Sequence, residues 1–376
     1  MRPIPSCGYA TDSRQQMTPR SLLMSEANFI YLSQEEAVRC GAADVPATVA
    51  DTERTTLLAY QGKAIEAPTA TLFWGVPAEK LKNFVGYPSK KRANIHAGYL
   101  DDNGVMKVAL KNIPSNPDNP INGKGPRASG LVTILDPETG YPLALMDAMV
   151  ISCMRTGALG AIGVKHLRRP GSRSIGLIGV GPINQAAIAC TAEVMPELEV
   201  AYVYDLNTER AEAFAAEFSR KLNIDVRAVD SARAACADAD VVIPATNVQT
   251  IDDAYIAPDW MKKGSLLVDL SIWDATFETL ARADGYVMNS AISMERKTMT
   301  PSVMVDRGLA REEEIIDLGK VIAGETSGRR DDEDMIVYFA RGMAIYDVMC
   351  GYRVYENALQ NGVGEKLSLW QSAFWS

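Results

Sequence analysis

The sequence predicts an α/β protein of two domains, one of them built on a doubly wound parallel sheet, and three observations lead to this prediction. The chain has 376 residues, which at roughly 150 residues per domain corresponds to two domains. Residues 64–146 follow a strand-like pattern. From residue 174 onward, short apolar strands alternate with helical segments, and such repeated units form parallel sheets with right-handed crossovers.

The composition is that of a globular protein and excludes several functional classes. Apolar residues make up 47% of the chain and charged residues 23%, so disordered and fibrous classes are excluded. Lys plus Arg number 38 and Asp plus Glu 47, which gives a net charge of −9. A nucleic-acid or anionic-membrane binder needs the opposite balance, and no run of about 18 apolar residues indicates a membrane span. The expected ligand is therefore a small molecule.

The few, widely spaced cysteines and histidines limit the kinds of chemistry that the protein can carry out. The six cysteines lie far apart and form no C-x-x-C pair, so neither a disulfide scaffold nor a metal site is predicted, and a reducing cytoplasm is expected. His96 and His166 are the two histidines of the chain. His166 has the surroundings of a surface helix residue, and the role of His96 stays open. Any chemistry must rely mainly on Lys, Arg, Asp, Glu or a cofactor.

The first domain is expected to follow an N-terminal arm. Residues 1–26 have no apolar segment typical of a secretory signal and are interpreted as a flexible arm or a dimer-embracing extension. Helix is predicted for 47–61, a strand for 105–111, and a hairpin for 131–135 and 141–146 around an Asp-Pro-x-x-Gly loop. Residues 115–127 form a long Pro/Asn/Gly loop, and loops of that length are more often functional than accidental.

Residues 147–167 are predicted to be a helix rich in Gly and Ala. Small residues allow another backbone to approach closely, although an ordinary buried connecting helix has the same pattern. Arg168-Arg169-Pro170-Gly171 ends this helix, and the domain boundary is placed there.

The second domain is predicted to cover residues 168–334. Its strands are expected at 174–178, 200–204, 226–229, 241–243, 266–270 and 286–288, with helices at 182–195 and 207–221. The second helix has one apolar face, formed by Ala211, Phe214, Ala215 and Phe218. After a charged loop at 324–334, a strand-like segment (335–340) and a helix (342–359) are expected to fold back onto the first domain, so that 27–167 and 335–376 form one unit.

The strongest motif is Gly179-Val180-Gly181-Pro182-Ile183-Asn184, between a predicted strand and a predicted helix. The first Gly permits a tight turn, and the second lets the backbone approach a pyrophosphate held at the helix N-terminus. Proline suits the first helical turn because no N–H donor is needed there. Asn184 departs from the dinucleotide fingerprint, which has Gly or Ala at this position.

Asp205 ends the second strand, 24 residues after Gly181, near the offset of about 20 residues expected for the acid that binds the adenosine ribose. A carboxylate there repels a 2′-phosphate, and two like charges about 4 Å apart cost roughly 1–4 kcal/mol. The sequence therefore favours NAD(H) over NADP(H). Asp205 also suits the N-cap of the next helix, a position that Asn207 can take instead.

Three further charged residues are candidates for the substrate site. Asp274 follows a predicted parallel strand, so it either faces the ligand crevice or is a solvated loop residue. Arg155 lies among small and apolar residues, which suits a buried ion-pair partner or a carboxylate clamp. Lys111 ends an apolar strand and is either a solvated strand-end lysine or part of the site.

The chain resembles the ornithine cyclodeaminase/mu-crystallin family over nearly its whole length beyond the arm. The segments that carry the resemblance are 127–130, 136–140, 152–158, 179–184, 264–274, 324–329 and 342–345. Within the family, it is most similar to the N-(2-amino-2-carboxyethyl)-L-glutamate dehydrogenases of 2,3-diaminopropionate biosynthesis. The resemblance implies a homodimer, with a Rossmann-type NAD domain inserted into an α+β substrate and dimerisation domain built from both chain ends.

The resemblance also implies roles for individual residues. Lys111 and Arg155 bind the substrate carboxylate, and Asp274 is the acid/base group, with Lys111 counted in the catalytic set. The cofactor ligands are Gly179, Val180, Gly181, Pro182, Ile183 and Asp205, to which Thr156 and Thr246 are added. A further Arg nearer the N-terminus is implied, and residues 67–80 do not offer one.

The expected reaction is oxidation of a C–N bond. Hydride leaves the α-carbon of an N-substituted amino acid for NAD⁺, water attacks the resulting imine, and a 2-oxo acid and an amine separate; Asp274 accepts the amine proton or activates the water. In the closest subgroup the products are 2-oxoglutarate and 2,3-diaminopropionate. The alternatives are an ornithine cyclodeaminase, an imine reductase or amino-acid dehydrogenase, and a non-enzymatic ligand-binding protein of the mu-crystallin kind.

Overall fold

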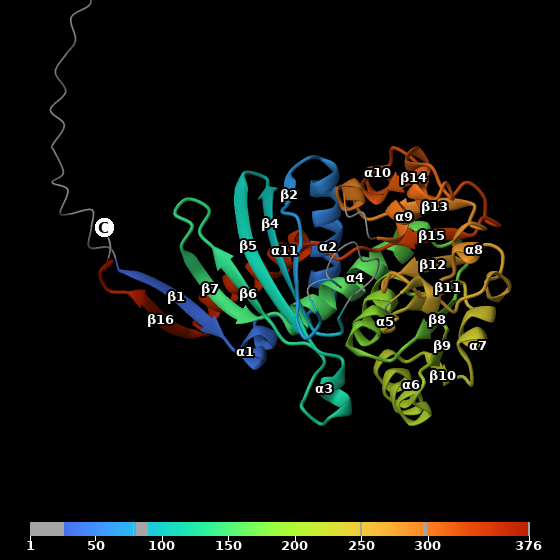
Figure 1. Cartoon of the computed structure of the whole chain (residues 1–376), viewed down its shortest axis with the longest axis horizontal. Coiled ribbons are helices and arrows are strands. Elements are labelled where there is room, and N and C mark those ends of the chain that lie inside the picture. The colour runs from blue at the N-terminus through green and yellow to red at the C-terminus, as the bar shows by residue number, and fades with distance from the viewer. Residues whose placement is uncertain (1–25, 78, 80–88, 249, 296–298, 375–376) are drawn as a thin grey trace, which may run out of the picture.

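Two β-sheets stand next to each other, and the long helix α4 (Met149–Leu167) lies between them (Figure 1). The computed structural model describes residues 26–77, 79, 89–248, 250–295 and 299–374, so the predicted arm lies outside the described residues except for Glu26. The fold is α/β, as predicted from the alternation of strands and helices.

The first sheet is mixed and contains both ends of the described chain. Its strand order is β16 (Glu365–Trp370), β1 (Ala27–Leu32), β7 (Pro142–Asp147), β6 (Leu131–Leu135), β5 (Val105–Ser115), β4 (Arg92–Asp102) and β2 (Ala64–Glu66), with β3 (Ala70–Phe73) also paired to β4. The predicted hairpin is confirmed, because β6 and β7 pair antiparallel. Helices α2 (Val45–Tyr60) and α11 (Ala344–Asn361) pack on its inner face.

The second sheet is parallel throughout. Its order is β10 (Asp225–Ala228), β9 (Val200–Tyr204), β8 (Ser174–Ile178), β11 (Val241–Pro244), β12 (Leu266–Asp269), β15 (Ile336–Phe339), β13 (Gly285–Met288) and β14 (Ile315–Asp317). Its longer helices are α5 (Pro182–Val194) and α6 (Thr208–Leu222). The predicted apolar face of α6 is buried, and Phe214 stacks on Phe218 at 4.4 Å between ring centroids.

One predicted boundary is wrong. The sequence pattern predicts that 335–340 belongs to the first domain, but β15 pairs with β12 and β13 inside the parallel sheet. Its four residues are buried and apolar, so the sequence pattern fits either sheet, and tertiary pairing decides. The chain returns to the first sheet only with α11 and β16.

The remaining elements are short. They are α1 (Gln34–Arg39), α3 (Asp118–Ile121), α7 (Ala232–Ala237), α8 (Phe277–Leu280), α9 (Thr300–Asp306), α10 (Leu318–Ile322) and the 3₁₀ turns Ile251–Asp253, Pro258–Trp260, Ala291–Glu295 and Glu312–Glu314. The long loop at 115–127 thus contains one short helix, α3.

The small residues of α4 do allow close packing. A Cβ added to Gly157 would stand 2.5 Å from the backbone of Ala186 in α5, and one added to Gly163 would stand 2.2 Å from the ring of Tyr338 in β15. Larger side chains at these two positions therefore cannot fit without displacing a neighbour. The close approach fixes α4 against both α5 and the parallel sheet.

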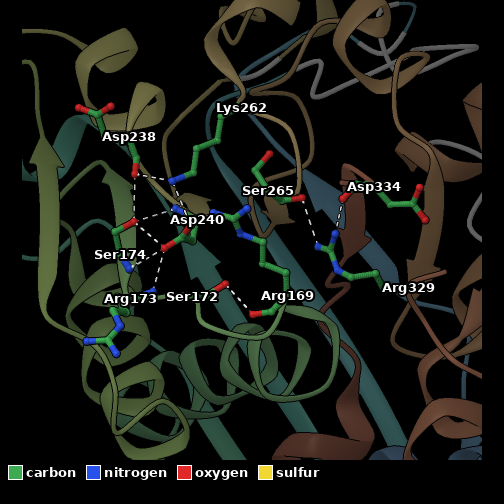
Figure 2. A network of polar contacts seen from close by, with 10 residues as sticks. All are labelled: Arg169, Ser172, Arg173, Ser174, Asp238, Asp240, Lys262, Ser265, Arg329 and Asp334. Atoms are coloured by element: carbon green, nitrogen blue, oxygen red, sulfur yellow. Dashed lines mark hydrogen bonds and ion pairs between the residues drawn. The ribbon is translucent and has the colours of Figure 1, made fainter. Parts of the chain in front are cut away.

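Asp240 forms hydrogen bonds that join the amino ends of the neighbouring strands β8 and β11 (Figure 2). Its Oδ1 accepts from Arg169 Nη2 and Lys262 Nζ, each at 2.9 Å. Its Oδ2 accepts from the backbone N–H groups of Arg173 and Ser174 and from the Ser174 hydroxyl, at 2.8, 3.0 and 2.9 Å. Burial acts to raise the pKa of Asp240, but these donors together hold it well below its usual range.

Candidate active site

The turn after β8 has the geometry of a phosphate-binding loop. Gly179 has a φ of +85°, and a Cβ on it would stand 2.7 Å from the Ala245 carbonyl oxygen, so only glycine fits there. Gly181 is the N-cap of α5 with no side-chain cap, and a Cβ on it would meet no described heavy atom within 4 Å. The loop therefore leaves room beside the positive end of a 13-residue helix, as a phosphate requires.

Asn184 replaces the small residue of the dinucleotide fingerprint and is fully buried. Its Nδ2 donates to the carbonyl oxygens of Ile178 and Gly179 at 3.0 and 2.6 Å. These bonds hold α5 against the end of β8. In the fingerprint, a Gly or Ala at this position brings the helix and the strand together by close packing. The departure from the fingerprint is thus compatible with a tight turn.

Asp205 directly follows β9 and contacts the same loop. Its Oδ2 accepts from Val180 N and its Oδ1 from Asn207 N, both at 3.0 Å. Asn207 is the N-cap of α6 and accepts from Arg210 N at 2.9 Å, so Asp205 is not the cap. The carboxylate therefore lies beside the glycine loop, where the ribose of a dinucleotide is expected.

Lys111 and Arg155 meet at one carboxylate, that of Asp347 on α11. Lys111 Nζ donates to Asp347 Oδ2 at 2.5 Å, and Arg155 Nε donates to Asp347 Oδ1 at 3.2 Å. The Lys111 and Arg155 side chains are 3% and 8% exposed. The interpretation of Lys111 as a solvated strand-end lysine is therefore wrong, since its strand turns this side chain toward α11.

The burial of this cluster changes the proton affinities of its members. Burial and the neighbouring Arg155 lower the pKa of Lys111 to about 8, against the attraction of Asp347 and Glu66. Burial acts to raise the pKa of Asp347, but Arg155 and Lys111 hold it below its usual value. The cluster thus contains two buried cations and an ionised carboxylate near neutral pH.

One guanidinium nitrogen of Arg155, Nη1, has no hydrogen-bond acceptor among the described residues. By contrast, Arg155 Nε bonds to Asp347, and Arg155 Nη2 lies 3.4 Å from Ser152 Oγ. Gly342 lies next to the unpaired nitrogen, and a Cβ at Gly342 would stand 2.7 Å from Arg155 Nη1. A buried cationic donor left open in this way is costly unless an anion fills it.

Two more basic side chains line the same face of the first sheet. Arg92 and His96 are buried residues of β4, and His96 lies opposite Lys111 in the register with β5. His96 Nδ1 lies 3.1 Å from the hydroxyl of Thr69. Sequence reasoning left His96 open and missed Arg92, which follows two lysines at a strand start and has no distinctive local pattern. The alternating burial of β4 places both on one face of the sheet, and a strand prediction over 92–102 could have indicated this.

Asp274 lies at the carboxyl end of the parallel sheet and is fully buried, so its interpretation as a solvated loop residue is wrong. Tyr255 donates to its Oδ1 at 2.9 Å, and the hydroxyls of Thr246 and Ser271 also donate to the carboxylate. Burial raises the pKa of Tyr255, which keeps this phenol protonated as a donor. Three hydroxyls therefore orient Asp274.

The loop that carries Asp274 has an unusual conformation. Ile272 has a φ of +86°, which a β-branched residue rarely adopts, and its carbonyl accepts from the Thr300 hydroxyl at 2.5 Å. Such a conformation persists only where the surroundings fix it, and it is frequent at functional sites.

A second buried ion pair joins the parallel sheet to the start of α11. Arg341 donates through Nη1 to the carbonyl of Asp269 at 2.9 Å and through Nη2 to its carboxylate. Asn289 accepts from Arg341 N at 2.8 Å and donates to the Tyr346 hydroxyl at 3.0 Å. These bonds fix the segment at 341–347, and with it Asp347 and the open side of Arg155.

The predicted residues therefore form three groups. Gly179 to Ile183 lie with Asp205, Thr246 lies with Asp274, and Lys111 lies with Arg155. Thr156 donates its hydroxyl to Ser152 O within α4, at 2.6 Å, next to the contact of α4 with α5. Among the described residues there is no His, Cys, Asp or Glu cluster that could hold a metal ion, and no helix there is long and apolar enough to cross a membrane.

Comparison with known proteins identifies similar sequences and folds. The model of the ornithine cyclodeaminase/mu-crystallin family matches residues 43–362. The N-((2S)-2-amino-2-carboxyethyl)-L-glutamate dehydrogenase of Staphylococcus aureus is 34% identical over 264 residues, which cover 69% of this chain and 77% of that protein.

Two solved structures are similar over nearly the whole chain. The Delta(1)-pyrroline-2-carboxylate reductase of Thermococcus litoralis, in complex with NADH and L-proline, has a TM-score of 0.77 and 28% identity and covers 90% of this chain and 99% of its own. An archaeal alanine dehydrogenase dimer with bound NAD has a TM-score of 0.77 and 26% identity and covers 92% of this chain and 100% of its own.

Proposed function

The chain belongs to the ornithine cyclodeaminase/mu-crystallin family, and from this premise we propose that it oxidises an N-substituted amino acid at the C–N bond. The relatives are dehydrogenases and reductases, so the chain is an NAD-dependent oxidoreductase acting on CH–NH bonds of amino acids, or a cyclodeaminase. The substrate, the reaction and the roles of the residues are the proposal.

The glycine loop is proposed to hold the cofactor. NAD⁺, when bound, supplies the hydride acceptor of the reaction. Gly179, Gly181 and the first turn of α5, with Val180, Pro182 and Ile183, are proposed to hold its pyrophosphate, with Thr156 and Thr246 as further contacts. The open space beside Gly181 supports this assignment. Asp205 is proposed to accept from the ribose hydroxyls and to disfavour a 2′-phosphate, since its carboxylate lies beside the loop.

The open Nη1 of Arg155 is the single observation that carries the proposal. A carboxylate placed there satisfies the unused donor, with Lys111 on the other side of the Asp347 bridge. Charge-assisted hydrogen bonds contribute about 1.5–3 kcal/mol each, and two such contacts fix the orientation of an amino-acid carboxylate. Arg92, buried on the same sheet face, is proposed as the additional Arg that members of the family use.

Asp274 is proposed as the acid/base group. Its three hydroxyl donors fix the carboxylate, and the strained loop at Ile272 holds it at the sheet edge where ligands of parallel sheets bind. It would accept the proton of the substrate amine as the C–N bond is oxidised, or remove a proton from the water that attacks the imine.

The proposed substrate is N-(2-amino-2-carboxyethyl)-L-glutamate. One substrate molecule, NAD⁺ and water give 2,3-diaminopropionate, 2-oxoglutarate, NADH and a proton. The similarity to the Staphylococcus aureus dehydrogenase supports this choice, and several basic residues on the inner face of the first sheet suit a substrate with several carboxylates. The similarity to the pyrroline carboxylate reductase favours a second candidate, an imine reductase that runs toward the amine.

A homodimer is also proposed. The outer face of the first sheet exposes large apolar side chains, among them Leu72 (61%), Ile95 (47%), Leu110 (41%) and Leu131 (42%). Ile95, Leu110 and Leu131 line a hollow of about 270 Å³. Monomeric proteins rarely expose a large continuous apolar patch. Sedimentation should therefore give a dimer for the wild type and a monomer for Leu110→Glu; a monomeric wild type would overturn this assignment.

Turnover of defined substrates tests the proposed function. The purified protein should form NADH with NAD⁺ and the glutamate adduct, and mass spectrometry should detect 2-oxoglutarate and 2,3-diaminopropionate. NADH consumption with cyclic imines, or with 2-oxo acids and ammonia, but none formed with the adduct would favour the reductase. Turnover of ornithine to proline in place of the adduct would make the protein a cyclodeaminase.

A further inference from the structure

The carboxylate of Asp274 is enclosed by the hydroxyl groups that bind it. Asp274 is fully buried, whereas the three residues whose hydroxyls donate to it, Thr246, Tyr255 and Ser271, are half-buried. A substrate that arrives from solvent therefore meets one of these hydroxyls before it meets the carboxylate. The surroundings of the three hydroxyls indicate which one lies on the side of the ligand.

Tyr255 reaches Asp274 from the far face of the parallel sheet. Side chains of β8, β11 and β12 alternate between two core clusters, so these clusters lie on opposite faces of the sheet. Helix α4 and the first sheet contribute to one cluster. Tyr255 packs against the other cluster, with its ring centroid 6.4 Å from that of Trp260. Its phenol therefore supports Asp274 from the face turned away from the first sheet.

The hydroxyl of Ser271 is engaged with the end of β11. Its Oγ accepts from Thr246 N at 3.2 Å and also lies 3.2 Å from Pro244 O. A serine hydroxyl has one hydrogen, and this hydrogen has two acceptors here, Pro244 O and the Asp274 carboxylate. Ser271 therefore ties the carboxylate to the backbone of β11.

Thr246 is the donor beside the glycine loop. A Cβ added to Gly179 would stand 3.5 Å from Thr246 Cγ2. The next residue, Asn247, accepts from Nη1 of Arg127, in the loop that leads into β6 of the first sheet, at 2.5 Å. Thr246 gives its one hydrogen to Asp274 Oδ1, and a hydroxyl oxygen that donates still accepts through its lone pairs. Its position thus suits a group that contacts both the ligand and Asp274.

We propose that the Thr246 hydroxyl is a catalytic group that takes the proton of the substrate amine and passes its own proton to Asp274. As hydride leaves the α-carbon for NAD⁺, the electron pair of the amine N–H bond forms the C=N bond, and the proton goes to Thr246 Oγ1. The hydrogen that Thr246 held goes to Asp274 Oδ1. The threonine is unchanged afterwards, and the carboxylate has become a carboxylic acid. This inference rests on the proposed function and adds the route of the proton to it.

Steady-state kinetics of threonine variants test this route. Thr246→Val keeps the shape of the side chain without its hydroxyl and should lower kcat for the glutamate adduct about 10²-fold, with KM and NADH affinity within a few-fold of the wild type. Thr246→Ser restores a hydroxyl and should recover most of the loss. Thr191→Val is the matched control, because it removes a buried α5 hydroxyl that has no hydrogen-bond partner among the described residues, and it should keep the wild-type kcat.

A tyrosine variant separates proton transfer from orientation of the carboxylate. Tyr255 donates to the same oxygen as Thr246, Asp274 Oδ1, at 2.9 Å. Tyr255→Phe should lower kcat by about tenfold or less, because the two other hydroxyls still hold the carboxylate. Equal losses of kcat in Tyr255→Phe and Thr246→Val would mean that both hydroxyls only orient Asp274, and the proposed route would be wrong.

The outcomes distinguish this inference from the proposed function. If the wild type oxidises the adduct and Thr246→Val keeps its kcat, the route is wrong while the proposed function stands. If the valine variant weakens substrate or NADH binding as much as it lowers kcat, Thr246 is only a binding residue. If the wild type reduces a cyclic imine instead, the proposed substrate fails, and the same variants are compared with that imine, since the proton then takes the reverse route. No turnover of either substrate would overturn both proposals. Thermal melting verifies that each variant is folded.

Discussion

Two buried aspartates, Asp240 and Asp347, each face two cations, yet their surroundings differ. Asp240 receives five hydrogen bonds (Figure 2). The side chains of its partners Arg169 and Lys262 are 30% and 31% exposed. Asp347 receives bonds from Lys111 and Arg155, which are almost completely buried.

The difference supports the proposal that the Asp347 cluster binds a ligand. The Asp240 cluster satisfies its carboxylate with groups of the chain itself and stabilises the sheet. The Asp347 cluster leaves Arg155 Nη1 open in a buried position, an arrangement that folding alone does not favour. A buried ion pair is thus a poor indicator of function by itself, and the open donor beside it is the informative feature.

The largest expected effect is on the catalytic step. Asp274→Asn should lower kcat about 10²- to 10⁴-fold, because the amide cannot accept a proton, while substrate and NADH binding persist. Steady-state kinetics and NADH fluorescence measure the two properties. Asp240→Asn is the matched control and should keep the wild-type kcat. Near wild-type activity of Asp274→Asn would show that this carboxylate is not the acid/base group.

Removing one cation from each cluster tests the comparison directly. Arg155→Met should lower kcat/KM about 10²- to 10³-fold, because a buried charge partner is lost together with a carboxylate contact. Arg169→Met should lower stability and leave kcat/KM within a few-fold of the wild type. Kinetics and thermal melting of both variants give the answer, and equal kinetic losses would remove the functional distinction between the clusters.

The choice between NAD⁺ and NADP⁺ tests the proposed role of the Asp205 carboxylate. Asp205→Ser should improve the use of NADP⁺ relative to NAD⁺ about fivefold to a thousandfold, since a repulsion of roughly 1–4 kcal/mol is removed. The ratio of kcat/KM for the two cofactors is the measurement. An unchanged ratio would mean that Asp205 serves only to bind Val180 N and Asn207 N.

The pKa of Lys111 predicts a smaller effect. The lysine is charged below its pKa of about 8 and loses its proton above it, so carboxylate binding weakens as the pH rises. We expect kcat/KM to fall about tenfold per pH unit above pH 8. Lys111→Arg should move this decline to higher pH, because a guanidinium stays charged. A decline at the same pH in the variant would assign it to another group.

The smallest effect concerns stability in acid. Since the pKa of Asp240 is held low, its contribution is present above the unfolded value of about 3.9 and is lost as the pH falls through the folded value. Asp240→Asn should lower the free energy of unfolding at pH 7 by about 1–3 kcal/mol and flatten its decline below pH 4. Urea unfolding at several pH values measures both; an unchanged pH profile would contradict the role of this carboxylate.

Local patterns were sufficient to predict much of the fold and part of the site. The glycine motif, the caps and the periodicity of α6 depend on neighbouring residues, so the sequence displays them. Asp347 could not be found in this way, because a single aspartate in an apolar helix has no local sign of a partner 236 residues away. The position of β15 was missed for the same reason, since strand order depends on tertiary pairing.

The most direct test of the central claim is a crystal structure of the protein with NADH and an N-substituted amino acid. We expect a substrate carboxylate within hydrogen-bond distance of Arg155 Nη1, with Lys111 Nζ on its other side and Asp347 still bridging the two. A substrate bound elsewhere, with Arg155 Nη1 unoccupied, would contradict the claim that the Asp347 cluster is the carboxylate site.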